Sequence, residues 1–402
     1  MKILMVNKFL YPRGGSESYM LSLGEHLKKS GHEVQYFGMY DEKNTVGNSS
    51  GIYTSNMDFH SKGLARFLYP FKIIYSFEAK RKIIKVIDEF KPDIVHMNNI
   101  NFQLTPSVIY GAKKRKVPVI QTVHDYQMLC PNHVFYNFNK NQPCEKCING
   151  SHINCIKNKC IHNSAVKSII GVVEAKLYSL LKAYKKVDLF ICPSHFLEKK
   201  LLSAKKFYKG KTYTIHNFID KKAFSKTDEN QSSYIVYVGR LSKEKGVEAL
   251  AETAKLLSEH TFVVAGNGPE EDTLKNIENI ELKGFVTGDE LTKLMGNAKV
   301  LLLPSVCYEN CPLSILEAHS MGVPVVTMNS GGMAELVKDG VTGTLVDTPS
   351  AEEIAKKLKR TIEDEEYYKK LKENCKNEKE NILSVETYCD ILTEQYKKLI
   401  MR

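Results

Sequence analysis

Short apolar segments of the β type alternate with stretches of helical periodicity along the whole chain. Six such segments lie in the first half, at residues 2–7, 33–38, 93–97, 117–123, 187–192 and 212–215. Six more lie in the second half, at residues 234–238, 260–265, 280–283, 299–303, 323–327 and 343–346. Strand–helix alternation produces parallel sheets that are covered by helices on both faces. The sequence therefore predicts an α/β protein with two Rossmann-like, doubly wound domains.

A polar stretch at residues 217–233 separates the two sets of strands. The chain has 402 residues, of which 43% are hydrophobic, and this is enough apolar material for two cores. We therefore expect an N-terminal domain over residues 1–216 and a C-terminal domain over residues 217–384.

The two halves carry opposite charge. Residues 1–215 contain 33 Lys and Arg against 15 Asp and Glu, while the whole chain has a net charge of +11, so the second half is acidic. This asymmetry indicates an anionic partner for the first half, which could be a phosphorylated acceptor, an acidic bilayer surface or nucleic acid.

The chain begins directly with a strand-like run, residues 1–7, without the cationic and apolar regions of a signal peptide. No apolar stretch approaches the roughly 18–20 residues of a membrane span. We therefore expect a cytoplasmic protein, either free or peripheral on the inner face of the cell membrane.

Two carboxylates, Glu309 and Glu317, flank the start of an expected helix. Pro312 suits the first turn of this helix, and Gly322 ends it. The free N–H groups of the helix start lie between the carboxylates and favour an anion. This order suits a sugar, its phosphates and a ribose in a row; the alternative is a solvated acidic pair beside an ordinary helix.

Two cations follow the strand expected at residues 234–238. Arg240 and Lys245 lie just past its carboxyl end, which is where open α/β sheets bind ligands. Arg offers a planar fork to phosphate oxygens and Lys a mobile point charge. A pair of solvated surface cations is the alternative interpretation.

Polar groups also follow strands in the first half. Gly14 and Gly15 allow close approach of a ligand after the first strand, and Ser16 can cap the next helix. The full G-x-G-x-x-G fingerprint is absent, which disfavours NAD. His124 and Asp125 end the strand at residues 117–123, a position from which polar side chains can reach a ligand; the alternative is a structural histidine.

Taken in order, these motifs resemble the retaining nucleotide-sugar glycosyltransferases of family 4 (glycosyltransferases group 1). The resemblance extends from residue 2 to about residue 395, and it is carried by Gly14-Gly15, His124-Asp125, Asn217, Gly239-Arg240, Lys245-Gly246, Gly266-Asn-Gly-Pro269 and Glu309-x7-Glu317. It implies the GT-B arrangement, in which two Rossmann-like domains face each other across an active-site cleft. It also implies that a last helix, within residues 385–402, crosses back onto the first domain.

The resemblance further implies a role for each matching residue. His124 would lie beside the transferred sugar, Glu309 would hold sugar hydroxyls, Glu317 would accept hydrogen bonds from the ribose, and Arg240 and Lys245 would stabilise the leaving diphosphate. The donor site would be completed by Gly14, Gly15, Gly239, Gly266, Phe285, Val286, Asn310, Cys311, Pro312 and Leu313. The donor would be a UDP- or GDP-linked sugar, and same-face substitution would retain the anomeric configuration.

The Glu309-x7-Glu317 motif departs from the family pattern after its first glutamate. Asn310, Cys311, Pro312 and Leu313 stand where the family usually has glycines, which puts the shape of the sugar pocket in doubt. No D-x-D motif follows a strand, so we expect transfer without a metal or other cofactor. Analogy with the family and the basic first half indicate a lipid-linked or surface-polysaccharide oligosaccharide as the acceptor.

Five of the ten cysteines fall within residues 130–160, which we interpret as an insertion in the N-terminal domain. Clustered thiols in a cytosolic chain indicate a metal site rather than disulfides. The expected ligands of a structural zinc ion are Cys130, Cys144, Cys147 and Cys160, with Cys155, His133, His152 or His162 as substitutes.

Aromatic and basic side chains interleave over residues 61–85, a pattern typical of docking on an anionic bilayer or of a helix that faces the core. No recognised nucleic-acid-binding module accompanies the charge, so nucleic acid is not expected as a partner. The remaining alternatives to glycosyl transfer are an epimerase-like enzyme on the same scaffold, a zinc-stabilised nucleic-acid-binding protein, and a phosphorylase-like enzyme with Lys-bound pyridoxal phosphate.

Overall fold

The computed structural model describes residues 1–56, 74–148, 150–220 and 234–401. The chain forms two compact units. The first unit contains Met1–Phe135, Glu145–His216 and Val385–Arg402, and the second contains Tyr136–Cys144 and Asn217–Ser384.

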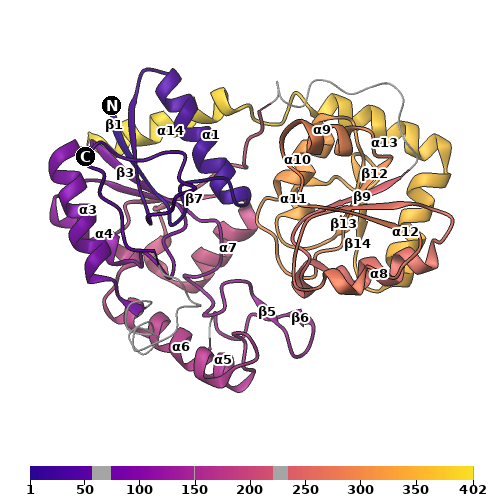
Figure 1. Ribbon diagram of the computed structural model, residues 1–402, viewed down its shortest axis with the longest axis horizontal. Coiled ribbons are helices and arrows are strands. Elements are labelled where there is room, and N and C mark those ends of the chain that lie inside the picture. The colour runs from indigo at the N-terminus through magenta and orange to yellow at the C-terminus, as the bar shows by residue number, and fades with distance from the viewer. Residues whose placement is uncertain (57–73, 149, 221–233, 402) are drawn as a thin grey trace. The chain divides into compact units, whose positions relative to one another are not determined.

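The first unit is built on a six-stranded parallel sheet with the order β2-β1-β3-β4-β7-β8 (Figure 1). Its strands are β1 (Lys2–Val6), β2 (Glu33–Phe37), β3 (Ile94–Met97), β4 (Val119–Thr122), β7 (Leu189–Cys192) and β8 (Thr212–Thr214). Its helices are α1 (Gly15–Lys29), α3 (Phe77–Phe90), α4 (Ser107–Lys114), α5 (Ile153–Lys157), α6 (Ala165–Leu180), α7 (His195–Ala204) and α14 (Val385–Ile400). Every residue of β3 and β4 is buried, as expected for central strands that are covered on both faces.

The second unit is built on a parallel sheet with the order β11-β10-β9-β12-β13-β14. Its strands are β9 (Ile235–Val238), β10 (Phe262–Ala265), β11 (Ile280–Gly284), β12 (Val300–Leu303), β13 (Val325–Met328) and β14 (Gly343–Val346). Its helices are α8 (Val247–Leu256), α9 (Gly288–Gly296), α10 (Leu313–Ser320), α11 (Met333–Leu336), α12 (Ala351–Glu363) and α13 (Glu365–Glu378). The two sheets confirm the predicted α/β class, and all twelve predicted strands are present.

A small hairpin interrupts the predicted insertion at residues 130–160. Strands β5 (Tyr136–Asn137) and β6 (Gln142–Pro143) pair antiparallel, and the segment that contains them belongs to the second unit. The Asn141 amide donates to Glu248 Oε2 on α8 at 3.3 Å. The sequence analysis placed this segment in the first domain, whereas the contacts of the chain group it with the second unit.

Each sheet has one place where the chain reverses the direction in which it adds strands. In the first sheet β1 lies between β2 and β3, and in the second β9 lies between β10 and β12. The loops that leave the two strands at such a point diverge to opposite faces and leave a crevice where ligands bind. Gly14, Arg240, Lys245 and Glu309 fall on the loops that leave β1, β9 and β12 at these points.

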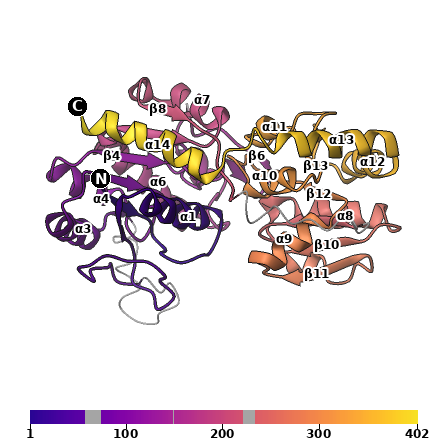
Figure 2. The same cartoon turned by 90° about the horizontal axis from the view of Figure 1, so that it is seen from above.

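The last helix, α14, completes the core of the first unit. It lies along α1, as both views show (Figure 1, Figure 2). The Tyr388 hydroxyl is 2.7 Å from that of Tyr19, and the Tyr396 hydroxyl is 2.6 Å from Nδ1 of His96 on β3. The return of the last helix to the first unit is therefore as expected.

The basic and aromatic segment at residues 61–85 is described only in part, because residues 57–73 lie outside the described residues. From Phe77 onwards the segment is helix α3, which buries Ala79, Ile83, Val86, Ile87 and Phe90 and so faces the core. Within the described ranges, no helix is both long enough and apolar enough to span a bilayer.

We predict that Tyr396→Phe lowers the free energy of unfolding of the first unit by about 1–3 kcal/mol, because the His96 ring nitrogen would lose its buried partner. Urea denaturation followed by circular dichroism measures this. Tyr40→Phe is the matched control, since the Tyr40 ring is 55% exposed. An equal midpoint for Tyr396→Phe and the wild type would contradict the assigned role.

Candidate active site

At the switch point of the second sheet, the loops after β9 and β12 bring Lys245 and Glu309 together. The N–H groups of Val306 and Cys307 both donate to the Glu244 carbonyl oxygen at 3.0 Å, which ties one loop to the other. Lys245 Nζ then forms an ion pair with Glu309 Oε1. Two residues that the sequence analysis placed in separate motifs are therefore a cation and an anion in direct contact.

Two glycines allow the loops to approach so closely. Gly246 has φ 76°, and a Cβ at this position would lie 2.0 Å from the carbonyl oxygen of Pro304. Gly331 has φ 60°, and a Cβ there would lie 2.7 Å from the Glu309 carbonyl oxygen. The next residue, Gly332, donates its N–H to that same oxygen at 2.7 Å. Glu309 is thus held by its backbone, and only glycine fits at either position.

The surroundings of the pair fix its charge. Burial by itself would lower the pKa of the Lys245 amine, but the facing Glu309 carboxylate outweighs burial and raises the pKa above its usual value. Ser305 Oγ donates to the same carboxylate oxygen at 2.9 Å. A charge in such a place requires a partner, and an anionic ligand with several oxygens could replace Glu309 as the partner of Lys245.

The Gly239-Arg240 and Gly266–Pro269 segments pack backbone against backbone. A Cβ at Gly266 would lie 1.8 Å from the Gly239 carbonyl oxygen, and one at Gly268 would lie 2.0 Å from that of Leu241. The Leu241 N–H donates to the Asn267 carbonyl at 3.0 Å. These glycines therefore shape the loop from which the exposed Arg240 side chain extends.

Helix α10 begins at Leu313, with Pro312 as its N-cap. Asn217 fixes the chain just before the helix: its side-chain amide donates to the Cys311 carbonyl at 2.9 Å, and its N–H donates to Cys311 Sγ at 3.3 Å. Asn310 lies between this anchored residue and Glu309.

The Glu317 carboxylate lies on α10 with no hydrogen-bond or ion-pair partner among the described residues. Burial raises its pKa to about 7. A half-buried carboxylate without a protein partner is ready to accept hydrogen bonds from a ligand.

Phe285 and Val286 follow the edge strand β11, which is separated from β9 by β10. The Phe285 ring is 63% exposed and Val286 is 8% exposed. Like the ion pair, they therefore follow the carboxyl end of a strand, but this strand is two positions away from β9 in the sheet.

A second polar cluster lies at the switch point of the first sheet. Gly14 is the N-cap of α1, and Gly15 is its first residue. Ser16 was expected to cap this helix, but its hydroxyl donates to Glu17 Oε2 at 3.1 Å and accepts from Asn99 Nδ2 at 2.8 Å. Asn7 closes the cluster by donating to Glu17 Oε1 at 3.2 Å. The sequence analysis missed the buried Glu17, although an acid beside a double glycine was a signal for it.

His124 lies after β4 and is neutral at pH 7. Burial lowers its pKa to about 4, although Asp125 works in the opposite direction. Its Nε2 lies 3.0 Å from Asn98 Oδ1, and its ring packs edge-on against Tyr19 with ring centroids 5.0 Å apart. A neutral, packed imidazole suits the expected position beside a sugar better than proton transfer.

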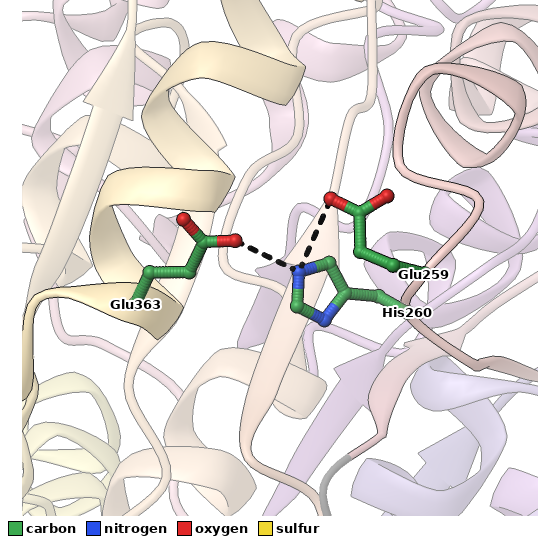
Figure 3. Close-up of side chains that lie close together, drawn as sticks. All are labelled: Glu259, His260 and Glu363. Atoms are coloured by element: carbon green, nitrogen blue, oxygen red, sulfur yellow. Dashed lines mark hydrogen bonds and ion pairs between the residues drawn. The ribbon is translucent and has the colours of Figure 1, made fainter.

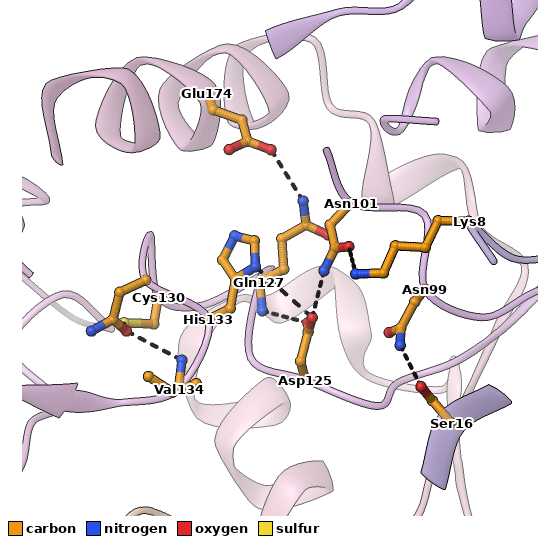
Figure 4. A network of polar contacts seen from close by, with 11 residues as sticks. Lys8, Ser16, Asn99, Asn101, Asp125, Gln127, Cys130, His133, Val134 and Glu174 are labelled. Carbon is orange, nitrogen blue, oxygen red and sulfur yellow. Dashed lines mark hydrogen bonds and ion pairs between the residues drawn. The ribbon is translucent and has the colours of Figure 1, made fainter. Parts of the chain in front are cut away.

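A chain of hydrogen bonds that was not predicted includes Asp125, the residue after His124 (Figure 4). Lys8 Nζ donates to Asn101 Oδ1 at 2.7 Å, and Asn101 Nδ2 donates to Asp125 Oδ2 at 2.7 Å. The Gln127 N–H donates to Asp125 Oδ1 at 2.9 Å, and its side chain donates to Glu174 Oε1 at 3.1 Å. A concave surface next to this chain is lined by polar residues that include Asn98, Asn99, Gln121, His124 and Asp125.

The pKa values of two groups in this network are shifted from their usual values. Burial raises the pKa of Glu174 to about 7, and Asp125 adds to this shift, although hydrogen bonds from Gln127 and Tyr178 oppose it. Burial also lowers the pKa of Lys8. Perturbed groups beside a concave surface are typical of functional sites.

The predicted zinc ligands are divided between the units. Cys130, Cys147 and Cys160 belong to the first unit with Cys155, and Cys144 belongs to the second. None of the ten cysteines, all of which lie in the described residues, forms a disulfide bond.

Among the described residues, Glu259, His260 and Glu363 form a group of ligand-type side chains with atoms within 4.8 Å of one another (Figure 3). Lys359 Nζ lies 3.6 Å from Glu259 and 3.7 Å from Glu363, so a protein cation already neutralises this exposed group. We therefore assign it no metal.

We predict that Gly246→Ala destabilises the second unit by about 3 kcal/mol more than Gly340→Ala does. Gly340 also has a positive φ, 70°, but a Cβ there meets nothing within 4 Å, so this control carries only the conformational cost of about 1–2 kcal/mol. Urea unfolding of both variants measures the difference. Equal losses would show that the approach to Pro304 is not the constraint.

Comparison with known proteins identifies the family. The model of Glycosyltransferase Family 4 matches residues 13–223, and that of Glycosyl transferases group 1 matches residues 218–378. An uncharacterized 42.6 kDa protein in the cps region of Klebsiella pneumoniae is 28% identical over 355 residues, which are 84% of this chain and 87% of that protein. The sulfoquinovosyl transferase SQD2 of Arabidopsis thaliana is 23% identical over 82% of this chain and 61% of its own length.

Solved structures show the same fold. The chain matches Anabaena HepE in complex with UDP with a TM-score of 0.71 and 19% identity, over 99% of this chain and 100% of that one. Sucrose-phosphate synthase from Thermosynechococcus elongatus matches with a TM-score of 0.71 and 16% identity, over 100% and 99% of the two chains. The fold, the two switch-point clusters and the family matches together lead to one conclusion: the chain belongs to Glycosyltransferase Family 4 and is a glycosyltransferase with the GT-B fold.

Proposed function

We propose that the protein transfers a sugar from a nucleoside diphosphate sugar to an acceptor hydroxyl with retention of configuration. The observation that carries the proposal is the Lys245–Glu309 ion pair at the switch point of the second sheet, followed by the unpartnered Glu317 on α10. A cation for the diphosphate, a carboxylate for the sugar hydroxyls and a half-buried carboxylate for the ribose hydroxyls are the partners that a nucleotide sugar requires.

In this proposal the second unit holds the donor. Lys245 pairs with the diphosphate while Glu309 turns to hydroxyls of the sugar, so the ion pair of the free protein is exchanged for two charged contacts with the ligand. Arg240 extends freely from the Gly239 loop and adds a second cation for the diphosphate. Glu317 accepts hydrogen bonds from the ribose hydroxyls.

The chemical step follows from these roles. The bond between the anomeric carbon and the diphosphate oxygen breaks, and its electron pair leaves with the diphosphate. The acceptor oxygen bonds to the anomeric carbon on the same face, and its proton passes to the leaving phosphate oxygen. Arg240 and Lys245 stabilise the charge that develops on the leaving group, so we propose that transfer needs no added metal.

We assign the acceptor to the first unit. The polar surface beside Asn98 and Asp125 offers amide and carboxylate groups of the kind that bind saccharide hydroxyls. The basic excess of residues 1–215 supports an anionic acceptor, such as a lipid-linked or surface-polysaccharide oligosaccharide. The cps region origin of the Klebsiella relative supports the same assignment. Such an acceptor would bring the enzyme to the inner face of the cell membrane.

Binding of UDP or GDP in the presence of EDTA tests the donor site. We predict that one of them binds to the wild type by calorimetry, and that Glu317→Ala weakens this binding at least about tenfold, which is about 1.4 kcal/mol. Glu352→Ala, an exposed acid in the first turn of α12, is the matched control and keeps wild-type affinity. The structure of HepE with UDP makes UDP the first choice.

Three outcomes would contradict the proposed function. If a folded Glu317→Ala protein binds the nucleotide as well as the wild type does, the ribose assignment fails. If neither nucleotide binds and the protein instead binds nucleic acid with steep salt dependence, the zinc-stabilised nucleic-acid-binding alternative replaces this proposal. Conversion of a nucleotide sugar without an acceptor would favour the epimerase-like alternative.

A pH dependence follows from the raised pKa of Glu317. Below pH 7 this carboxyl is protonated in the free protein, and hydroxyl donors prefer the ionised form, so affinity for a nucleotide sugar should rise between pH 6 and pH 8. UDP-glucose is a suitable probe because its diphosphate does not titrate in this range. We expect the rise to be absent in Glu317→Gln, and a rise of the same size in this variant would assign it to another group.

Retention of configuration has its own measurement. We expect the anomeric centre of the product, followed by NMR during turnover, to have the configuration of the donor sugar. An inverted product would contradict the same-face route.

A further inference from the structure

Four of the five cysteines of the insertion gather in the first unit. Cys147, Cys155 and Cys160 form one buried cluster with Val172, and none of them is more than 7% exposed. Cys130, from the loop after β4, is equally buried. The thiols of Cys155 and Cys160 interact with each other, and Cys130 and Cys147 lie in their neighbourhood. Among the described residues no three of these sulfur atoms lie within 4.8 Å of one another, so binding of one ion requires rotation of the cysteine side chains.

The backbone explains how distant cysteines come together. Gly171 on α6 is the meeting point: a Cβ there would lie 2.4 Å from Ile161 Cδ1 and 3.2 Å from the Pro131 carbonyl oxygen. The residues beside Cys160 and Cys130 thus contact the same position of α6. On the other side, the Asn154 amide donates to the Lys146 carbonyl at 3.1 Å, which places the residue before Cys147 next to the residue before Cys155.

Few other interactions stabilise the segment that carries Cys147, Cys155 and Cys160. Its regular structure is the five-residue helix α5, and the apolar side chains that accompany the cysteines are Val172, Ile156 and Ile161. Lys159, His162 and Asn163 all have positive φ, which side chains other than glycine adopt at a cost. A segment with so small a core requires another source of stability, and a structural metal is a common one.

We propose that Cys130, Cys147, Cys155 and Cys160 bind one structural zinc ion. Four thiolates in a tetrahedron at about 2.3 Å from the metal are the usual closed, non-catalytic zinc site. The set differs from the one predicted from spacing, because Cys155 takes the place of Cys144, which belongs to the second unit.

The neighbouring polar groups fit this assignment. Cys130 Sγ currently donates to Asn132 Oδ1 at 2.9 Å, and Asn132 keeps a second donor, the Val134 N–H at 3.2 Å, when the thiol is ionised. His133, a possible substitute ligand, is directed elsewhere: it stacks on Phe102 with centroids 5.1 Å apart, and its Nδ1 is 3.9 Å from Asp125. The ion would therefore fix the loop that carries His133 beside the hydrogen-bonded chain of Asp125.

Metal analysis of the full-length protein, purified without chelator, tests the proposal. We expect about one zinc per chain in the wild type. Cys130→Ser, Cys147→Ser, Cys155→Ser and Cys160→Ser should each reduce the bound zinc at least about tenfold after dialysis. Cys144→Ser and Cys375→Ser are the controls and should retain it; Cys375 is a buried cysteine of the second unit.

Cobalt substitution of the wild type keeps the test decisive if the serine variants do not fold. The intensity of the thiolate-to-cobalt charge-transfer band reports the number of sulfur ligands, and four are expected. Wild-type protein that retains neither zinc nor cobalt would overturn the proposal, as would a band that corresponds to fewer thiolates. Loss of zinc in Cys144→Ser with retention in Cys155→Ser would replace this ligand set by the one predicted from the sequence.

Discussion

The strand order of the two parallel sheets is the constraint on which the rest of the structure depends. Because every strand runs the same way, all the loops that leave the strand ends lie at one edge, and only the reversal of strand order opens a space between them. The Lys245–Glu309 pair and the Asn7–Glu17 cluster occupy these two positions. The strand order therefore determines where these two clusters can lie, and the sequence determines which side chains form them.

The fold was largely predictable because buried parallel strands leave a strong local signal. A run such as residues 300–303 is apolar at every position, and the structure buries every one of them. The α/β class, the twelve strands and the return of the last helix followed from such patterns and from the resemblance. The hairpin at residues 136–143 did not, because two-residue strands have no periodicity and their place depends on contacts with α8 far along the chain.

The candidate site was predictable where a motif is continuous in sequence. Glu309, Glu317, Arg240 and Lys245 were found in this way, although no spacing rule indicated that Lys245 and Glu309 touch. The chain of Lys8, Asn101, Asp125 and Glu174 was missed because its members come from four separate segments, and each is an ordinary polar residue by itself. Ser16 was misassigned as a cap because its competing partner, Asn99, lies 83 positions away.

The position of α14 has a consequence for folding during synthesis on the ribosome. The first unit includes both ends of the chain. The buried His96 ring gains its hydrogen bond to Tyr396 only after a further 300 residues have been synthesised. Residues 217–384 form a continuous stretch and can fold while the rest of the chain is still being made. The unit that is synthesised first is therefore completed only when α14 has been made, and its surface under α14 stays exposed to chaperones until then.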